Sequence, residues 1–122
     1  MRADPIALES IFGNLITNAL NYTPEGGRIR VEVDITGVNV RARVVDNGLG
    51  IAEKYLDKIF ERFYRVKDEK TRYITGTGLG LPIVKGLLDA MGGIIEVQST
   101  PGEGSVFTVL LPVQASPKLM TS

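Results

Sequence analysis

Two asparagines in the first quarter of the chain, Asn14 and Asn18, have the side chain and the spacing for chemistry at a metal ion. They lie four residues apart in a segment of helical periodicity, so they share one face of the predicted helix. An amide oxygen can ligate a hard cation such as Mg²⁺. Exposure on the helix surface is the alternative. Because Asn14 lies among Phe12, Leu15 and Ile16, we expect at least one asparagine to face inward, where it needs a partner such as magnesium or phosphate.

Three glycine-rich segments follow in order, at residues 46–50, 76–81 and 101–105. Glycine allows positive φ and a close approach of backbone to a ligand, so repeated Gly-x-Gly pieces indicate a site built from main chain. The second segment leads into a predicted helix, whose first N–H groups would attract phosphate; a flexible hinge is the alternative. Neither the Walker pattern nor the dinucleotide glycine pattern occurs in the sequence. Together with the asparagines, these segments predict a nucleotide–magnesium site.

Two charged residues could complete such a site. Asp46 ends a predicted strand, where its carboxylate could accept an N–H from a purine; a capped turn is the alternative. Arg65 follows Phe60 and Phe63, which we expect in the core, and precedes a polar, aperiodic stretch. Its planar guanidinium could reach a γ-phosphate, although a solvated surface arginine has the same sequence pattern.

The composition limits the classes of function. The 122 residues are 43% hydrophobic and 23% charged, as in an ordinary globular domain. With 14 basic and 14 acidic residues, no net charge points to nucleic acid or a membrane surface. The chain has no cysteine and no histidine, which excludes disulfides and histidine-based catalysis. Any phosphohistidine would therefore lie outside these residues.

Hydrophobic periodicity predicts the elements that hold these residues. A helix over 5–22 is followed by strands over 29–35 and 38–45, a short helix over 53–60 and a polar loop over 65–75. A second long helix around 83–91 precedes strands over 94–99 and 106–111. This order predicts an α+β fold, a two-layer α/β sandwich whose mixed, mostly antiparallel sheet carries helices on one face.

Five segments together resemble the catalytic, ATP-binding domain of sensor histidine kinases, in the superfamily shared with gyrase, Hsp90 and MutL. The resemblance covers residues 4–112. Residues 14–24 resemble the asparagine box, 46–51 the first glycine box, 59–66 the phenylalanine box, 76–81 the second glycine box and 102–112 the closing glycine segment. Five boxes in the family's order are far more specific than any one of them.

The resemblance implies roles for individual residues. Asn18 would ligate Mg²⁺, and Asn14 would support the ion and phosphates in place of the glutamate that activates water in hydrolysing members. Asp46 would accept the adenine amino group, Arg65 would reach the γ-phosphate, and residues 66–77 would form an ATP lid between the layers. The other implied nucleotide-binding residues are Asn21, which replaces a frequent lysine, Tyr22, Gly48, Gly50, Ile51, Gly76, Thr77, Gly78, Leu79, Gly80 and Leu81.

The implied domain covers residues 1–113, lacks the family's leading strand and is followed by a disordered tail over 114–122. It would bind Mg·ATP and transfer the γ-phosphoryl group to a histidine on a separate dimerisation domain, with a response regulator downstream. It could not autophosphorylate alone. We expect a cytoplasmic domain, without nucleic-acid or membrane contact of its own, in a parent protein that can be membrane-anchored. A non-catalytic nucleotide-binding module and an anti-sigma-type serine kinase are the alternatives.

Overall fold

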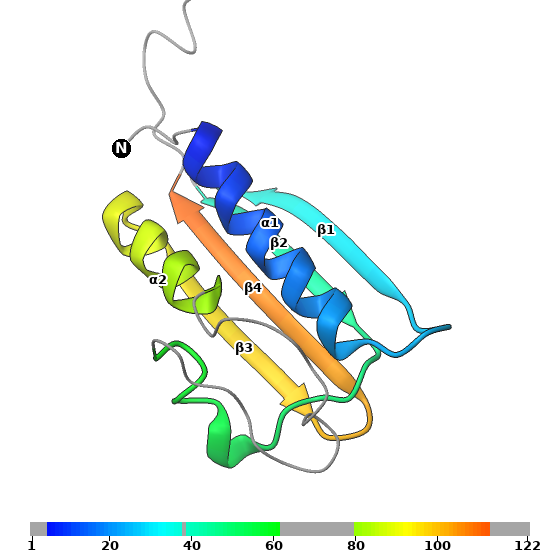
Figure 1. Ribbon diagram of the computed structural model, residues 1–122. Coiled ribbons are helices and arrows are strands. Elements are labelled where there is room, and N and C mark those ends of the chain that lie inside the picture. Colours follow the sequence, from blue (N-terminus) through cyan, green and yellow to red (C-terminus); the bar gives the residue numbers. More distant parts are fainter. Residues whose placement is uncertain (1–4, 38, 62–79, 113–122) are drawn as a thin grey trace, which may run out of the picture.

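The computed structural model describes residues 5–37, 39–61 and 80–112 as two helices lying on one face of a sheet (Figure 1). The fold has the two layers that the sequence predicts. In chain order the elements are α1 (Pro5–Tyr22), β1 (Ile29–Thr36), β2 (Asn39–Asp46), the 3₁₀ turn η1 (Glu53–Tyr55), α2 (Gly80–Met91), β3 (Ile94–Thr100) and β4 (Gly104–Pro112).

The strands pair in the order β1-β2-β4-β3, and each of these three pairings is antiparallel. The crossover places β4, the last strand described, between β2 and β3. In this register Asp46 at the end of β2 lies opposite Ile29 of β1 and opposite Ser105 of β4. The end of β2 is therefore flanked on both sides by strand backbone.

The core forms between the helices and one face of the sheet, because apolar residues recur with period two in the strands and with helical spacing in α1 and α2. In β2 the alternate residues Ala42, Val44 and Asp46 are buried. The largest fully buried side chains are Phe107, Ile11, Leu15, Leu88, Val44, Val84 and Val109. Asp46 thus ends a row that is otherwise apolar.

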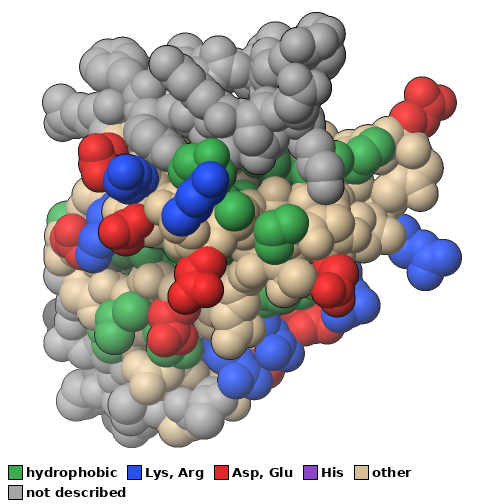
Figure 2. Space-filling view, turned by 90° about the horizontal axis from the view of Figure 1, so that it is seen from below, with side chains coloured by type: hydrophobic (Ala, Val, Ile, Leu, Met, Phe, Trp, Pro, Cys, Tyr) green, Lys and Arg blue, Asp and Glu red, His purple; other side chains and the backbone are tan. Residues whose placement is uncertain are grey.

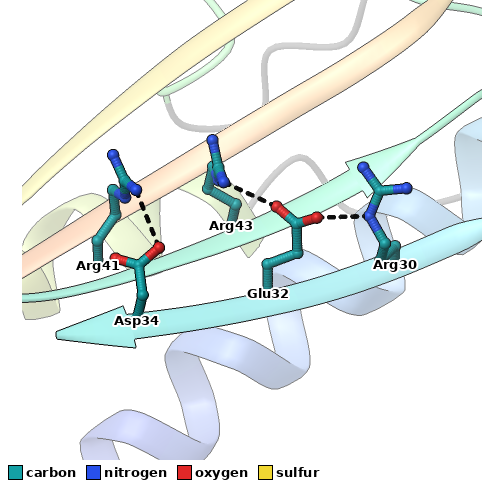
Figure 3. A network of polar contacts seen from close by, with 5 residues as sticks. All are labelled: Arg30, Glu32, Asp34, Arg41 and Arg43. Carbon is teal, nitrogen blue, oxygen red and sulfur yellow. Dashed lines mark hydrogen bonds and ion pairs between the residues drawn. The ribbon is translucent and has the colours of Figure 1, made fainter.

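The opposite face of the sheet is charged. Arg43 and Arg30 both pair with Glu32, at 2.9 and 2.7 Å, and Arg41 pairs with Asp34 at 2.9 Å (Figure 3). These side chains come from β1 and β2 and are partly exposed, so each pair is worth only about 0–1 kcal/mol. In Figure 2, charges of both signs alternate over the surface seen from below. The ion pairs therefore occupy the partly exposed face of β1 and β2, opposite the helices.

Strand β1 is an edge of the described sheet, and its apolar row is only partly covered. Val31, Val33 and Ile35 are 47%, 64% and 75% exposed although they alternate with Glu32 and Asp34 as in a half-buried strand. Alternation therefore predicted the strand correctly but not how much of its apolar face is buried.

The remaining differences from the sequence predictions are local. The prediction of a short helix over 53–60 is wrong, because only Glu53–Tyr55 form a 3₁₀ helix. The chain then continues as turns, in which the N–H of Lys58 donates to the carbonyl of Tyr55 at 2.9 Å and the N–H of Glu61 donates to the carbonyl of Lys58 at 3.0 Å. The loop over 65–75 and the tail over 114–122 lie outside the described residues. No helix in the described part of the chain is long and apolar enough to cross a membrane.

Burial predicts that replacing two helix leucines by alanine lowers stability by very different amounts. Leu88 is fully buried and Leu20 is 60% exposed. Leu88→Ala should lower the free energy of unfolding by about 2–5 kcal/mol, because it removes core contacts and leaves a cavity. The matched control Leu20→Ala should stay within about 0.5 kcal/mol. Urea unfolding measures both; equal losses would contradict the placement of the core.

Candidate functional site

Asp46 is a buried carboxylate at the end of β2, only 4% exposed. Its Oδ1 accepts the N–H of Gly48 at 2.9 Å, and the N–H of Ser105 also donates to the carboxylate. Burial raises the pKa of Asp46, and these two hydrogen bonds oppose part of that rise. A carboxylate has about four acceptor positions, so capping the turn leaves capacity for a further donor. The capped turn and the ligand role are therefore compatible.

The first glycine segment lies against the end of α1. The N–H of Leu49 donates to the carbonyl of Tyr22 at 2.9 Å, and a Cβ on Gly48 would clash with the same carbonyl. Asn47 Oδ1 accepts the N–H of Arg28 at 2.6 Å, which fixes the chain on its way into β1. Tyr22, half-buried against the core, is thereby held beside the segment that carries Asp46.

The third glycine segment lies against the other side of the first. The N–H of Gly102 donates to the carbonyl of Leu49 at 2.8 Å. Gly50 has a φ of 72°, and a Cβ there would clash with the carbonyl of Thr100; Gly104 has a φ of 116° and lies equally close to the carbonyl of Asp46. Contact between protein backbones therefore already requires glycine at positions 48, 50 and 104. A ligand contact at Gly48 or Gly50 stays a prediction.

Two serine hydroxyls connect these segments. Ser99 Oγ accepts the N–H of Ile51 at 2.6 Å, donates to the carbonyl of Gly104 at 3.0 Å and lies 2.7 Å from Ser105 Oγ. Ile51 and Ser105 are 3% and 4% exposed. No role was predicted from the sequence for either serine. The sequence pattern that could have drawn attention to them is a serine at the strand position where the next apolar residue would be expected. That the two serines lie side by side follows only from the pairing register of β3 and β4.

The asparagines form a second corner with the start of α2. Asn14 and Asn18 are both half-buried on α1, as expected for an inward-facing pair. Asn14 Nδ2 donates to the carbonyl of Ser10 at 2.7 Å, and its Oδ1 lies 3.2 Å from the position of a Cβ on Gly80. Since α2 begins at Gly80, an amide oxygen is placed beside a helix N-terminus, where unpaired N–H groups favour anions.

Helix α1 connects the two corners. Tyr22 is the eighth residue after Asn14, which places it about 12 Å further along the axis at the α-helical rise. Leu81 is half-buried against the core beside Gly80, while Asn21 is exposed. The structure thus places Asn14 beside the start of α2, about 12 Å along α1 from the corner that Tyr22 shares with the segment after Asp46. The predicted site residues Arg65, Gly76, Thr77, Gly78 and Leu79 lie outside the described residues.

Comparison with known families gives one match over nearly the whole chain. The model of the histidine kinase-, DNA gyrase B- and HSP90-like ATPase domain matches residues 3–115. The sensor histidine kinase WalK of Bacillus subtilis is 40% identical over 111 residues, which are 89% of this chain and 18% of WalK. The sensor-like histidine kinase SenX3 of Mycolicibacterium smegmatis is 39% identical over 111 residues, 91% of this chain and 29% of that protein. The chain therefore spans less than a third of the length of these relatives.

Solved structures share the fold. The mycobacterial sensor histidine kinase MprB superposes with a TM-score of 0.80 at 30% identity, covering 90% of this chain and 74% of that one. The catalytic domain of the histidine kinase ThkA gives 0.76 at 32% identity, with 90% and 68% covered. Full-length ShkA, whose structure contains AMPPNP, gives 0.72 at 34% identity over 91% of this chain and 23% of that one.

The backbone contacts predict that alanine substitutions at two glycines change the stability of the fold in opposite directions. Gly50→Ala should lower the free energy of unfolding by at least about 2 kcal/mol, because it combines positive φ with a clash against the Thr100 carbonyl. Gly13→Ala, in α1 with nothing within 4 Å of the new Cβ, should raise it by about 0.5–1 kcal/mol. Denaturant unfolding measures both. A neutral Gly50→Ala would mean that the two turns do not touch.

Proposed function

Because this chain belongs to the family of histidine kinase-, DNA gyrase B- and HSP90-like ATPases, we propose that it binds Mg·ATP and passes the γ-phosphoryl group to a histidine on a separate dimerisation domain. The observation that carries the proposal is the buried, hydrogen-bonded carboxylate of Asp46 beside the end of α1. The relatives named as sensor histidine kinases and the AMPPNP in ShkA support it. The sequence has no histidine, so the acceptor lies outside these residues.

At the base end, Asp46 accepts a hydrogen bond from the adenine amino group. The carboxylate is held by the N–H groups of Gly48 and Ser105, so it does not have to reorganise when the base arrives. Tyr22 and Ile51 flank the base, and the backbone at Gly48 and Gly50 sets how deeply it enters. Because a hydrogen bond to a charged acceptor is worth about 1.5–3 kcal/mol, this contact is strong enough to select the base.

At the phosphate end, the N-terminus of α2 at Gly80 and Leu81 receives phosphate oxygens through backbone N–H groups. Asn18 ligates Mg²⁺ and Asn14 supports it; the hard amide oxygens fit this ion, which usually keeps waters and substrate phosphates as its other ligands. Bound Mg²⁺ supplies charge neutralisation for the phosphates. Further phosphate contacts come from the second glycine segment, through Gly76, Thr77, Gly78 and Leu79. Arg65 reaches the γ-phosphate, and the exposed Asn21 adds a polar contact.

The identity of Asn14 explains why the phosphoryl group would await a histidine. An amide has no basic pKa in the working range, so Asn14 cannot take a proton from water as a carboxylate can. Phosphoryl transfer otherwise needs positioning and charge stabilisation, which this arrangement supplies without a protein nucleophile. Water attack would be slow. A response regulator would then receive the group from the phosphohistidine.

Phosphate labelling tests the transfer. The chain is incubated with Mg²⁺, ATP labelled in its γ-phosphate and its matching dimerisation domain. We expect label on the histidine of that domain, stable in alkali and lost in acid. A chain that binds ATP without labelling its partner would be a non-catalytic nucleotide-binding module, and acid-stable label on serine would indicate a serine kinase. Either result would overturn the proposal.

Exchanging the carboxylate tests the base contact. Asp46→Asn keeps an acceptor oxygen for the turn but places an NH₂ donor where the adenine amino group would donate. Affinity for ATP should fall by about 10–100-fold, from the loss of about 1.5–3 kcal/mol. Titration calorimetry measures this, and circular dichroism checks the fold. Lys85→Gln, on the exposed side of α2, is the control and should bind as the parent does. Unchanged affinity in folded Asp46→Asn would refute the adenine contact.

A further inference from the structure

The turn after β2 contains an asparagine followed directly by a glycine, at Asn47 and Gly48. The chain has five asparagines, and the other four precede leucine, alanine, tyrosine or valine. Asparagine is a thermolabile residue, because the backbone nitrogen of the next residue can attack its side-chain amide. A Cβ on that next residue hinders the attack, and glycine has none. Asn47 is therefore the most reactive asparagine in this sequence.

The reaction at such a pair is a cyclisation followed by hydrolysis. The nitrogen of Gly48 loses its proton and forms a bond to Cγ of Asn47, while the bond from Cγ to Nδ2 breaks. The Nδ2 group leaves as ammonia with that proton, and the five-membered ring that remains is a succinimide. Water then adds to either ring carbonyl and opens it. One opening gives aspartate; the other gives isoaspartate, whose main chain runs through Cβ and Cγ and is one carbon longer.

In the folded turn both reacting groups are engaged in other hydrogen bonds. The N–H of Gly48 donates to Asp46 Oδ1 at 2.9 Å, so the nitrogen that must lose its proton faces a carboxylate. Negative charge there opposes the deprotonation, because it would repel the nitrogen anion. Asn47 Oδ1 accepts the N–H of Arg28 at 2.6 Å. Since that bond draws electron density from Cγ and favours attack, protection has to come from the Gly48 contact and from the backbone.

Three successive N–H groups fix the backbone of this turn. Those of residues 47–49 donate, in order, to the carbonyl of Arg28 at 3.2 Å, to Asp46 Oδ1 at 2.9 Å and to the carbonyl of Tyr22 at 2.9 Å. Gly48 is buried, and one carbon added to it would clash with the Tyr22 carbonyl. Ring closure changes the torsion angles around the bond between residues 47 and 48, so it requires the turn to open.

We propose that Asn47-Gly48 is a modification site: the folded turn protects it, and opening of the turn converts Asn47 irreversibly into aspartate and isoaspartate. Aspartate at this position keeps an acceptor for the N–H of Arg28 and can rebuild the turn. Isoaspartate cannot, because its longer main chain displaces Gly48, which has no space for one more carbon. The chemistry does not depend on nucleotide binding, although isoaspartate would also remove the N–H that holds Asp46.

Peptide mass spectrometry after incubation at mildly alkaline pH tests the site, with the chain either folded or in guanidinium chloride. Conversion replaces the amide of Asn47 by an acid, which changes the peptide mass. We expect conversion at least about tenfold slower in the folded chain, because it follows the population of the open turn. A peptide of residues 43–51, kept in both solutions, measures how the denaturant itself changes the chemistry. Equal corrected rates, or faster conversion at another asparagine of the unfolded chain, would overturn the proposal.

Substitutions separate the protecting contact from the reactive pair. Asp46→Ala removes the acceptor of the Gly48 N–H, so the folded variant should convert about threefold to tenfold faster than the folded parent. Lys85→Gln, which removes a charge on the exposed side of α2, is the control and should convert at the parent rate. Asn47→Gln would need a six-membered ring and should show no comparable mass change. An unchanged rate in folded Asp46→Ala would contradict the protecting contact, and if that variant does not fold, the comparison of folded and unfolded parent still decides.

Refolding tests the product. The converted chain is separated into its aspartate and isoaspartate forms, and each is returned from denaturant. We expect the aspartate form, like the variant Asn47→Asp, to recover the parent circular dichroism and unfolding midpoint, and the isoaspartate form to lose stability. An isoaspartate form as stable as the parent would refute the claim that the turn has no room for the longer main chain.

Discussion

Direct contact between main-chain segments is the constraint on which the rest of this structure depends. Residues 48–50 touch the carbonyl of Tyr22 on one side and the backbone around Thr100 and Gly102 on the other. No side chain larger than hydrogen fits at these contacts, so glycine recurs there for reasons of packing. The contacts hold the end of α1, the end of β2 and the β3–β4 turn in one arrangement. The direction of the Asp46 carboxylate follows from that arrangement.

The site lies where the apolar rows of the core end in polar residues. Burying a carboxylate is costly unless it is hydrogen-bonded, and the raised pKa of Asp46 reflects this cost. The N–H groups of Gly48 and Ser105 offset part of it. A partly compensated charge in rigid surroundings is what a base-recognition site requires, because a matching donor on the ligand supplies the remaining stabilisation. The same need for hydrogen-bond partners applies to Ser99 and Ser105, whose hydroxyls contact each other, while Ser99 also bonds to the backbone of Ile51 and Gly104.

Much of the fold and part of the candidate site could be predicted from the sequence. The range of α1 follows from helical periodicity over residues 5–22, and alternation predicted the strands within one or two residues. The position of Asp46 at a strand end was predicted from its neighbours alone. The hydroxyl contact between Ser99 and Ser105 could not be, since it depends on the pairing of β3 with β4. The residues after Tyr55 form turns in which Leu56, Ile59 and Phe60 pack against the core, and local periodicity could not distinguish these turns from a helix.

The central claim is that the Asp46 corner and the asparagine corner are the two ends of one Mg·ATP site. Calorimetric titration with a non-hydrolysable ATP analogue, with and without Mg²⁺, tests it most directly. We predict clear binding by the isolated chain that weakens when Mg²⁺ is removed. A folded chain that does not bind the analogue, or binds it equally well without the ion, would contradict this claim.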